Sequence, residues 1–233
     1  MAKIILVRHG KTAASHARRF RGRADVALGE FGIEQAKAAS ECIAALHDWR
    51  PTVVYTSPMQ RCVTTATIIG DTFSAPVHAV DALTDIHYGD WEELTVGQIK
   101  QRWPREFEVW CQNPQCAEIP GGETLQQVST RVRSAFKALV DRHRRDTFAV
   151  VSHNSVNRLL LLQVLDLPLS HYRSLTLEMG GISRIEYSNG RCWVKSVNET
   201  YHLTASQRIN RGEGAVPLEK RTFFDTTARH RSK

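Results

Sequence analysis

The chain has 233 residues, of which 42% are hydrophobic and 24% are charged, so its composition excludes collagen-like, low-complexity and wholly disordered proteins. A chain of this length can bury a hydrophobic core without disulfides or structural metals, and we expect one large domain. The net charge of +7 indicates an anionic partner, which the composition leaves open between nucleic acid, a membrane surface and a phosphorylated small molecule.

We expect neither a signal peptide nor a membrane span. The first apolar run ends at Arg8, and the richest apolar stretch, residues 159–165, is far shorter than the ~20 residues that cross a bilayer. The five cysteines are irregularly spaced, with only Cys111 and Cys116 close together, which favours reduced structural thiols over a zinc site. The expected compartment is the cytoplasm.

Short apolar runs alternate with helical patterns along the chain. The expected elements, in chain order, are a strand at 4–7, a helix at 31–49, a strand at 52–55, a helix at 57–73, a helix after the capping box 124–127, a strand at 147–151, a helix ending at 165, and a hairpin of 183–187 and 191–197. Ser57 and Pro58 are the expected N-cap and first-turn proline of the second helix. This alternation predicts an α/β fold with a mostly parallel sheet.

Three of the expected strands end in polar residues of one chemical character. The first ends in residues 8–10 (Arg-His-Gly), the second in residues 56–58 (Thr-Ser-Pro) followed by Arg61, and the third in residues 152–154 (Ser-His-Asn). Because ligands of open α/β sheets bind beyond the carboxyl ends of the strands, we expect these residues to converge. Two imidazoles and two guanidiniums around one point predict a phosphoryl-binding site, where Gly10 would let the backbone approach the ligand.

A set of motifs covers roughly residues 1–200. It comprises Leu-Val-Arg-His-Gly-Lys-Thr at 6–12, Arg21-Gly22, Asp25, Gly32, Gln35-Ala36, Ser57-Pro58 with Arg61, Thr65-Ala66, Gly89-x-Trp91-Glu92, residues 120–123 and residues 150–153. In this order the motifs resemble the histidine phosphatase superfamily, in its phosphoglycerate mutase-like branch. The resemblance implies a three-layer α/β/α sandwich. We expect this domain to span residues 1–207, with a cap segment at 86–123 and a basic tail at 208–233.

The resemblance also implies covalent catalysis, in which His9 becomes a phosphohistidine. Arg8, Arg61 and His153 would hold the non-bridging oxygens of the phosphoryl group and stabilise the charge that develops on them. These cationic groups make a metal ion or another cofactor unnecessary, so we expect none.

The leaving group needs a proton donor, and the family carries a glutamate at the position of Asp85. Asp85 offers the same chemistry with a carboxyl one methylene closer to the backbone, so it is the expected general acid. Glu92 is the alternative, and a helix-capping or solvated Asp85 is the competing interpretation.

The resemblance assigns substrate binding to Arg8, Gly10, Ser15, Arg21, Gly22, Arg61 and Asn154. Two of these residues depart from the family pattern. Ser15 stands where the signature carries asparagine and keeps a hydroxyl donor with a shorter reach. Asn154 replaces a glycine, and asparagine tolerates left-handed backbone conformations better than most residues.

The segment after Asp85 bears on the reaction type. It reaches residues 121–122 within about 36 residues and lacks the proline-rich insertion of cofactor-dependent mutases, which favours a phosphatase over a phosphoglycerate mutase. The segment is also rich in aromatic residues, namely Trp91, Trp103, Phe107 and Trp110. They are expected either to pack as an ordinary hydrophobic cap or to form an aromatic wall that selects the leaving group.

The charge is unevenly distributed along the chain. From Arg208 onward, seven basic and three acidic residues give a net charge of +4, so residues 1–207 carry only +3. No nucleic-acid-binding motif accompanies the tail, and we expect neither nucleic acid nor membrane as a partner. The expected partner is a phosphorylated small molecule, and a homodimer is left open. A catalytically weak phospho-ligand or phosphoprotein-binding protein is the alternative from another functional class.

Overall fold

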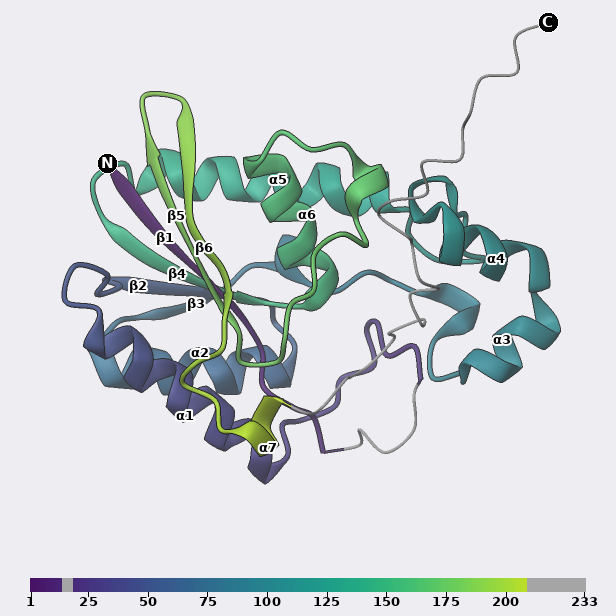
Figure 1. The fold of residues 1–233 in the computed structure, drawn as a ribbon, viewed down its shortest axis with the longest axis horizontal. Helices are drawn as coiled ribbons and strands as arrows, with labels where there is room; N and C mark the ends of the chain where they lie inside the picture. The colour runs from purple at the N-terminus through teal and green to yellow at the C-terminus, as the bar shows by residue number, and fades with distance from the viewer. Residues whose placement is uncertain (14–18, 209–233) are drawn as a thin grey trace, which may run out of the picture.

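The computed structural model describes residues 1–13 and 19–208, and a six-stranded sheet forms its centre (Figure 1). The strands are β1 (Ala2–Arg8), β2 (Val53–Thr56), β3 (Val77–Ala79), β4 (Thr147–Ser152), β5 (Ile182–Ser188) and β6 (Arg191–Glu199). Their order across the sheet is β3-β2-β4-β1-β5-β6. The first four in this order run parallel, and β5 pairs antiparallel with both β1 and β6. The sheet is therefore mixed and mostly parallel, which confirms the expected α/β class.

Helices cover both faces of the sheet (Figure 1). The principal helices are α1 (Glu30–Ala45) and α2 (Gln60–Phe73) on one face, and α5 (Leu125–Arg142) and α6 (Asn154–Val164) on the other. Because successive strand residues point to opposite faces, Ile5 and Val7 of β1 pack in the core under α1 and α2, whereas Ile4 and Leu6 pack in the core under α5 and α6. The result is the expected three-layer α/β/α sandwich.

Two local predictions are confirmed. The Thr124 hydroxyl accepts a hydrogen bond from the Gln127 backbone N–H, and the Gln127 side chain accepts one from the Thr124 N–H, so the capping box opens α5. Asn189 and Gly190 have φ values of 49° and 78°, as a tight two-residue hairpin turn requires. The capping box fixes the start of α5, and the turn at Asn189 and Gly190 allows β5 to pair with β6.

Two predicted helix boundaries are wrong. Helix α1 ends at Ala45 rather than Trp49, because residues 46–49 turn and bring Trp49 into the core under α1 and α2. Helix α2 begins at Gln60 with Met59 as its N-cap, so Ser57 is not the cap. The Ser57 side chain lies beside His153 instead, with 2.8 Å between Oγ and Nε2.

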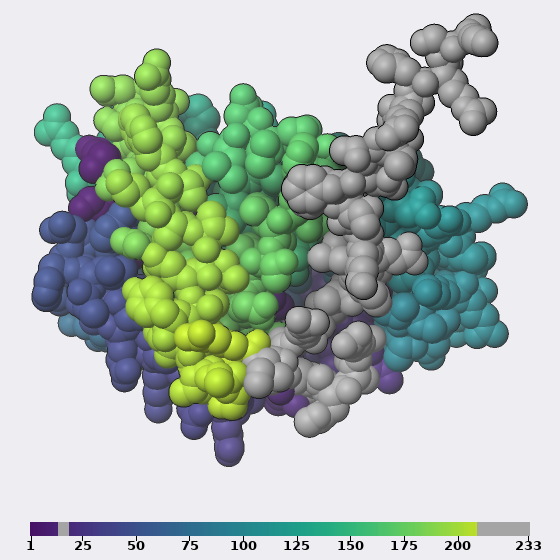
Figure 2. Space-filling model, viewed as in Figure 1, coloured from purple at the N-terminus to yellow at the C-terminus, as the bar shows by residue number. Residues whose placement is uncertain are grey.

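The cap segment (residues 86–123) lies at the end of the molecule opposite the N-terminus (Figure 1, Figure 2). Its elements are η2 (Gly89–Trp91), α3 (Val96–Arg102), α4 (Pro104–Gln112) and η3 (Pro114–Cys116). Trp91 is fully buried, with its ring 5.6 Å from Phe20 and 6.1 Å from Phe107 between centroids. Ordinary hydrophobic packing therefore accounts for Trp91 and Phe107.

The remaining short elements are η1 (Asp81–Leu83), η4 (Leu169–His171) and α7 (Ala205–Arg208). Residues 209–233 lie outside the described residues, so the division into a domain at 1–207 and a tail at 208–233 stays a prediction. No helix within residues 1–13 and 19–208 is long and apolar enough to cross a membrane.

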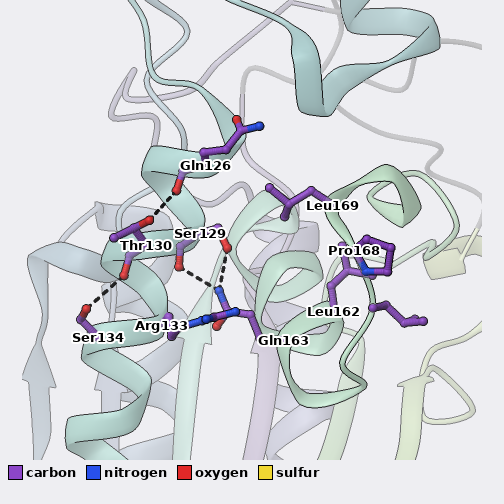
Figure 3. Close-up of a pocket in the computed structure, with 10 residues that line it drawn as sticks. Gln126, Ser129, Thr130, Arg133, Ser134, Leu162, Gln163, Pro168 and Leu169 are labelled. Carbon is purple, nitrogen blue, oxygen red and sulfur yellow. Dashed lines mark hydrogen bonds between the residues drawn. The ribbon is translucent and has the colours of Figure 1, made fainter.

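A surface groove of about 400 Å³ opens between α5 and the segment that follows α6 (Figure 3). Gln163 reaches across from α6 and donates hydrogen bonds to the carbonyl and hydroxyl of Ser129, at 2.8 and 2.9 Å. The described residues that line the groove include none of the predicted site residues, so we do not place the catalytic chemistry there.

Candidate active site

Side chains from neighbouring strand ends meet at the carboxyl edge of the parallel strands. His9 follows β1, Arg61 lies in the first turn of α2, and His153 follows β4 as the N-cap of α6. The His9 and His153 rings lie 5.2 Å apart between centroids, and the Arg61 Nε–H donates to His153 Nδ1 at 3.3 Å. All three side chains are at most 2% exposed. The structure thus brings together the residues that the sequence places on separate strand ends.

His9 has the geometry and the charge state of a nucleophile. Its Nδ1 lies 2.7 Å from the carbonyl oxygen of Gly10. Because a carbonyl only accepts, Nδ1 carries the proton and Nε2 keeps a lone pair. Burial, followed by the charges of Arg61 and Arg8, lowers the pKa of His9 well below its ordinary value, although the Gly10 contact opposes this shift. The imidazole is therefore neutral at neutral pH.

Backbone carbonyls fix the two arginines of the phosphoryl site. Arg61 donates from Nη1 to Ala24 O and from Nη2 to Gly22 O, both at 2.8 Å. Gly22 has a φ of 47°, and an added Cβ would lie 2.5 Å from Glu92 Oε1, so glycine is needed to present this carbonyl. Arg8 donates from Nη1 to Leu177 O at 2.6 Å. The two guanidiniums are therefore held by the main chain around His9.

His153 is a neutral imidazole with a defined tautomer. Because Nδ1 accepts from Arg61, the ring proton lies on Nε2, which donates to the Ser57 hydroxyl at 2.8 Å. Burial, then the charge of Arg61, lowers the pKa of His153 well below its ordinary value. Residues 56–58 were expected among the converging strand ends, but Ser57 itself was given only the role of a helix N-cap, so its contact with His153 was not predicted.

Asp85 lies against both the arginine and the histidine. Its Oδ2 is 3.8 Å from Arg61 Nη2 and 3.8 Å from His153 Nδ1, and its Oδ1 accepts from the Ser155 hydroxyl and from the Ile86 N–H at 2.9 Å. The side chain is 16% exposed. Burial raises the pKa of Asp85, although Arg61 opposes the shift. Asp85 is thus a partly buried carboxyl within the site and neither caps a helix nor lies in open solvent.

Glu92, the alternative acid, supports a loop. Its Oε1 accepts from the backbone N–H groups of Tyr88 and Arg23, at 3.1 and 3.0 Å. The carboxyl in contact with Arg61 and His153 is that of Asp85.

Arg131 of α5 holds the loop that carries Asp85, and the sequence analysis did not identify it. Its guanidinium donates to the carbonyls of Ala82, Thr84 and Asp85 at 2.7, 2.8 and 3.1 Å. It also pairs with Glu123 at 2.9 Å. Glu123 is part of the motif at residues 120–123, and this motif was the one sequence signal that could have pointed to its partner Arg131.

The surroundings of Gly10 and Asn154 bear on why these residue types occupy their positions. An added Cβ at Gly10 would lie 2.2 Å from Gly32 O, so this glycine permits contact with the start of α1, and its approach to a ligand stays a prediction. Asn154 is the first residue of α6 and is absent from the left-handed positions of the described chain, so left-handed tolerance is not what suits it to this site. Its side-chain oxygen is buried without a hydrogen-bond partner among the described residues.

Two predicted substrate-binding residues remain. Arg21 is 9% exposed, and its Nη1 lies 2.9 Å from both carboxylate oxygens of Glu93, so it joins the residue 19–28 loop to the cap segment. Ser15 lies outside the described residues.

A neutral buried imidazole, two buried guanidiniums and a carboxyl with a raised pKa define a site for phosphoryl transfer. The chain belongs to the histidine phosphatase superfamily (branch 1), whose family model matches residues 4–200. This confirms the resemblance noted in the sequence.

Individual relatives agree with the family assignment. The chain is 30% identical to "Phosphoserine phosphatase 1" of Hydrogenobacter thermophilus over 203 residues, which cover 87% of this chain and 95% of that protein. It is 31% identical to the "Metal-independent phosphoserine phosphatase" of Arabidopsis thaliana over 166 residues, 70% of this chain and 69% of that one. The solved structure "Bacillus stearothermophilus YhfR" matches with a TM-score of 0.81 at 30% identity, over 87% of this chain and 99% of that chain.

Proposed function

We propose that the protein is a metal-independent phosphomonoester hydrolase that transfers the phosphoryl group of a small metabolite first to His9 and then to water. The observation that carries the proposal is the neutral His9, whose Nδ1–H is bound to Gly10 and whose Nε2 is available beside Arg61 and His153. The family match and the two phosphoserine phosphatases, one of them named metal-independent, support the hydrolase class.

In the first step, the Nε2 lone pair of His9 attacks phosphorus in line with the ester P–O bond, so that a P–N bond forms as the P–O bond breaks. The ring becomes positively charged, and the Gly10 carbonyl stabilises the proton on Nδ1. Asp85 gives its proton to the departing alkoxide. Arg8, Arg61 and His153 stabilise the equatorial oxygens, with a phosphoryl oxygen replacing Ser57 as the acceptor from His153 Nε2.

In the second step, the Asp85 carboxylate takes a proton from a water molecule that attacks the phosphohistidine. The P–N bond breaks, inorganic phosphate leaves, and both His9 and the protonated Asp85 are restored. One carboxyl thus serves as acid and then as base, which suits a group whose pKa is raised above the ordinary aspartate value.

The first substrates to test follow from the relatives' names and include phosphoserine. We infer a cytoplasmic enzyme without nucleic-acid or membrane partners, and we leave homodimer formation to a sedimentation measurement.

The test is hydrolysis of p-nitrophenyl phosphate in EDTA by the wild type, by His9→Ala and by a control that removes an exposed histidine, His47→Ala. We expect turnover and an acid-labile phosphoenzyme in both the wild type and the control, and neither in His9→Ala. Activity that survives in His9→Ala overturns the mechanism. Faster interconversion of 2- and 3-phosphoglycerate than phosphate release would indicate a mutase instead, and ligand binding without turnover at any pH would indicate a binding protein.

A further inference from the structure

Two half-buried arginines near the active site, Arg158 and Arg173, form no ion pair with Asp or Glu within residues 1–13 and 19–208. Six other arginines of the described residues do have such partners, namely Arg21, Arg23, Arg61, Arg131, Arg144 and Arg184. A cation that is partly removed from water is costly unless an anion compensates it. We therefore ask which anion compensates the charges of Arg158 and Arg173.

Arg158 lies one helical turn from a residue that binds the proposed general acid, Asp85. It lies on α6 three residues after Ser155, whose hydroxyl binds the Asp85 carboxyl, and residues at this spacing share one face of a helix. The guanidinium carbon of Arg158 lies 5.3 Å from the centroid of the Tyr172 ring. The ring therefore fixes this charge near the Asp85 side of the site.

Arg173, in the segment after η4, links Arg158 and Tyr172 to the cap segment. Its guanidinium lies 5.5 Å from the Trp110 ring and donates to the Trp110 carbonyl at 2.5 Å. Trp110 in turn contacts Tyr172 and Tyr88, at 6.1 and 5.7 Å between ring centroids. Contacts therefore run from Arg158 through Tyr172 and Trp110 to Tyr88, which follows Asp85 by three residues.

The aromatic members of the cluster supply no anion to neutralise the two arginines. Burial raises the pKa of both Tyr88 and Tyr172, so their phenols are neutral at neutral pH. Burial lowers the pKa of Arg173, the nearby Tyr172 opposes this shift, and the charge of Arg158 adds to it. A ligand that brings a negative charge would relieve this repulsion.

We propose that Arg158 and Arg173 bind an anionic group on the leaving alcohol, a carboxylate or a second phosphate, and so select substrates with a negatively charged leaving group. This inference rests on the proposed function, because the alcohol of a phosphomonoester must leave beside the group that protonates it. Guanidiniums suit the role, since their planar set of donors matches both carboxylate and phosphate oxygens.

The experiment compares matched esters that differ in that charge alone. 3-Phosphoglycerate and glycerol 3-phosphate differ in a carboxylate, and propane-1,3-diol bisphosphate and its monophosphate differ in a second phosphate. We expect the wild type to favour the charged member of at least one pair by about tenfold to a hundredfold in kcat/KM, the effect of one or two charge-assisted hydrogen bonds. The pair that shows the preference identifies the anion.

Arg158→Met and Arg173→Met should reduce this preference about tenfold, because methionine keeps an apolar stem and loses the donors. Arg158→Lys, which keeps the charge, should retain most of the preference. The matched control is Arg145→Met, at an exposed arginine, and it should leave the preference unchanged. Arg158→Met is the decisive variant, because Arg173 also holds the Trp110 carbonyl and its loss can disturb the cap segment.

Equal kcat/KM values for both pairs in the wild type, or a preference unchanged in Arg158→Met, overturn the inference. In either case, His9-dependent hydrolysis of the esters whose leaving groups are uncharged would still support the proposed function. Calorimetric binding of the same esters to His9→Ala supplies a readout that needs no turnover. There, a preference for the charged members supports the anion site even if hydrolysis fails, and equal affinities overturn it.

Discussion

The active site holds its arginines in two different ways. In the phosphoryl half, Arg61 is 2% exposed and is bound by two backbone carbonyls and by His153. In the proposed leaving-group half, Arg158 lies against the ring of Tyr172, and Arg173 lies against the ring of Trp110 and donates to the Trp110 carbonyl. Carbonyls fix both the position and the direction of a guanidinium, whereas a ring face constrains mainly its distance. We therefore expect Arg61 to be held more rigidly than Arg158, and the proposed leaving-group half to accept alcohols of more than one shape.

The two halves also come from different parts of the fold. The phosphoryl half is assembled from the ends of β1 and β4 and the first turn of α2, which the parallel sheet brings to one edge. The leaving-group half combines the second turn of α6, the segment after η4 and the cap segment. Asp85 lies at the boundary and contacts both, through Arg61 on one side and Ser155 on the other.

The largest expected loss of activity follows from substitution of Asp85, at the boundary between the two halves. Asp85→Asn should reduce kcat/KM for alkyl phosphates by about 10²- to 10⁴-fold, the usual contribution of a general acid. The loss should be much smaller for p-nitrophenyl phosphate, whose leaving group departs without a proton. Equal losses on the two ester classes would contradict the acid role.

The pH profile sharpens the same prediction. Since the pKa of Asp85 is raised, deprotonation should set an alkaline limb of kcat/KM above the ordinary aspartate value of about 3.9. Since the pKa of His9 is lowered, protonation should set an acidic limb below the ordinary histidine value of about 6.5. Asp85→Asn should abolish the alkaline limb alone, and Asp85→Glu should retain it.

The same substitution in each half tests the comparison directly. Arg61→Lys should lower kcat/KM for 3-phosphoglycerate by about 10²- to 10³-fold, because one ammonium cannot reproduce the contacts to His153 and to two carbonyls. Arg158→Lys should lower it less than about tenfold, because it keeps the charge over the ring. Similar losses for the two variants would show that the halves do not differ in rigidity.

Substitution of two glycines by alanine should change the free energy of unfolding to different extents. Gly10→Ala should lower the free energy of unfolding by about 1–3 kcal/mol, because the new Cβ would lie 2.2 Å from Gly32 O. The control Gly97→Ala, in α3 of the cap segment, has nothing closer than Thr95 Oγ1 at 4.0 Å and should be neutral or slightly stabilising. Urea unfolding monitored by circular dichroism measures both, and a neutral Gly10→Ala would contradict the close contact with α1.

The smallest expected effect concerns Ser57. Ser57→Ala removes the acceptor of the His153 Nε2–H in the free enzyme, but a phosphoryl oxygen replaces that acceptor in the proposed transition state. We therefore expect kcat/KM to change less than about fivefold, which is below the effect of one hydrogen bond of about 1 kcal/mol. Ser57→Thr, which keeps a hydroxyl, is the matched control. A loss as large as that in Arg61→Lys would mean that Ser57 does more than orient the ring.

The sequence predicted the phosphoryl half far better than the leaving-group half. Strand ends of a parallel sheet must meet at one edge, so His9, Arg61 and His153 could be grouped before their contacts were known. Arg131 braces carbonyls 46 to 49 residues away, a contact that depends on how α5 docks on the sheet and leaves no local pattern. The pairing of Arg158 with Tyr172, and of Arg173 with Trp110, depends on side-chain packing in the same way. Ser57 shows a different error, because a helix-start pattern gave it a capping role that Met59 holds, while its side chain contacts His153.

The contacts of Arg61 have a consequence for folding. Residues 22–24 belong to no helix or strand, and the carbonyls of Gly22 and Ala24 are bound by a side chain from α2. This loop gains those bonds only after α2 has docked on the sheet, so we expect it to close late during folding and to open early in native-state hydrogen exchange. The same guanidinium would bind phosphate, so the last step of folding and the assembly of the catalytic site would be one event. A chain whose core is fully folded would still be inactive until this loop closes.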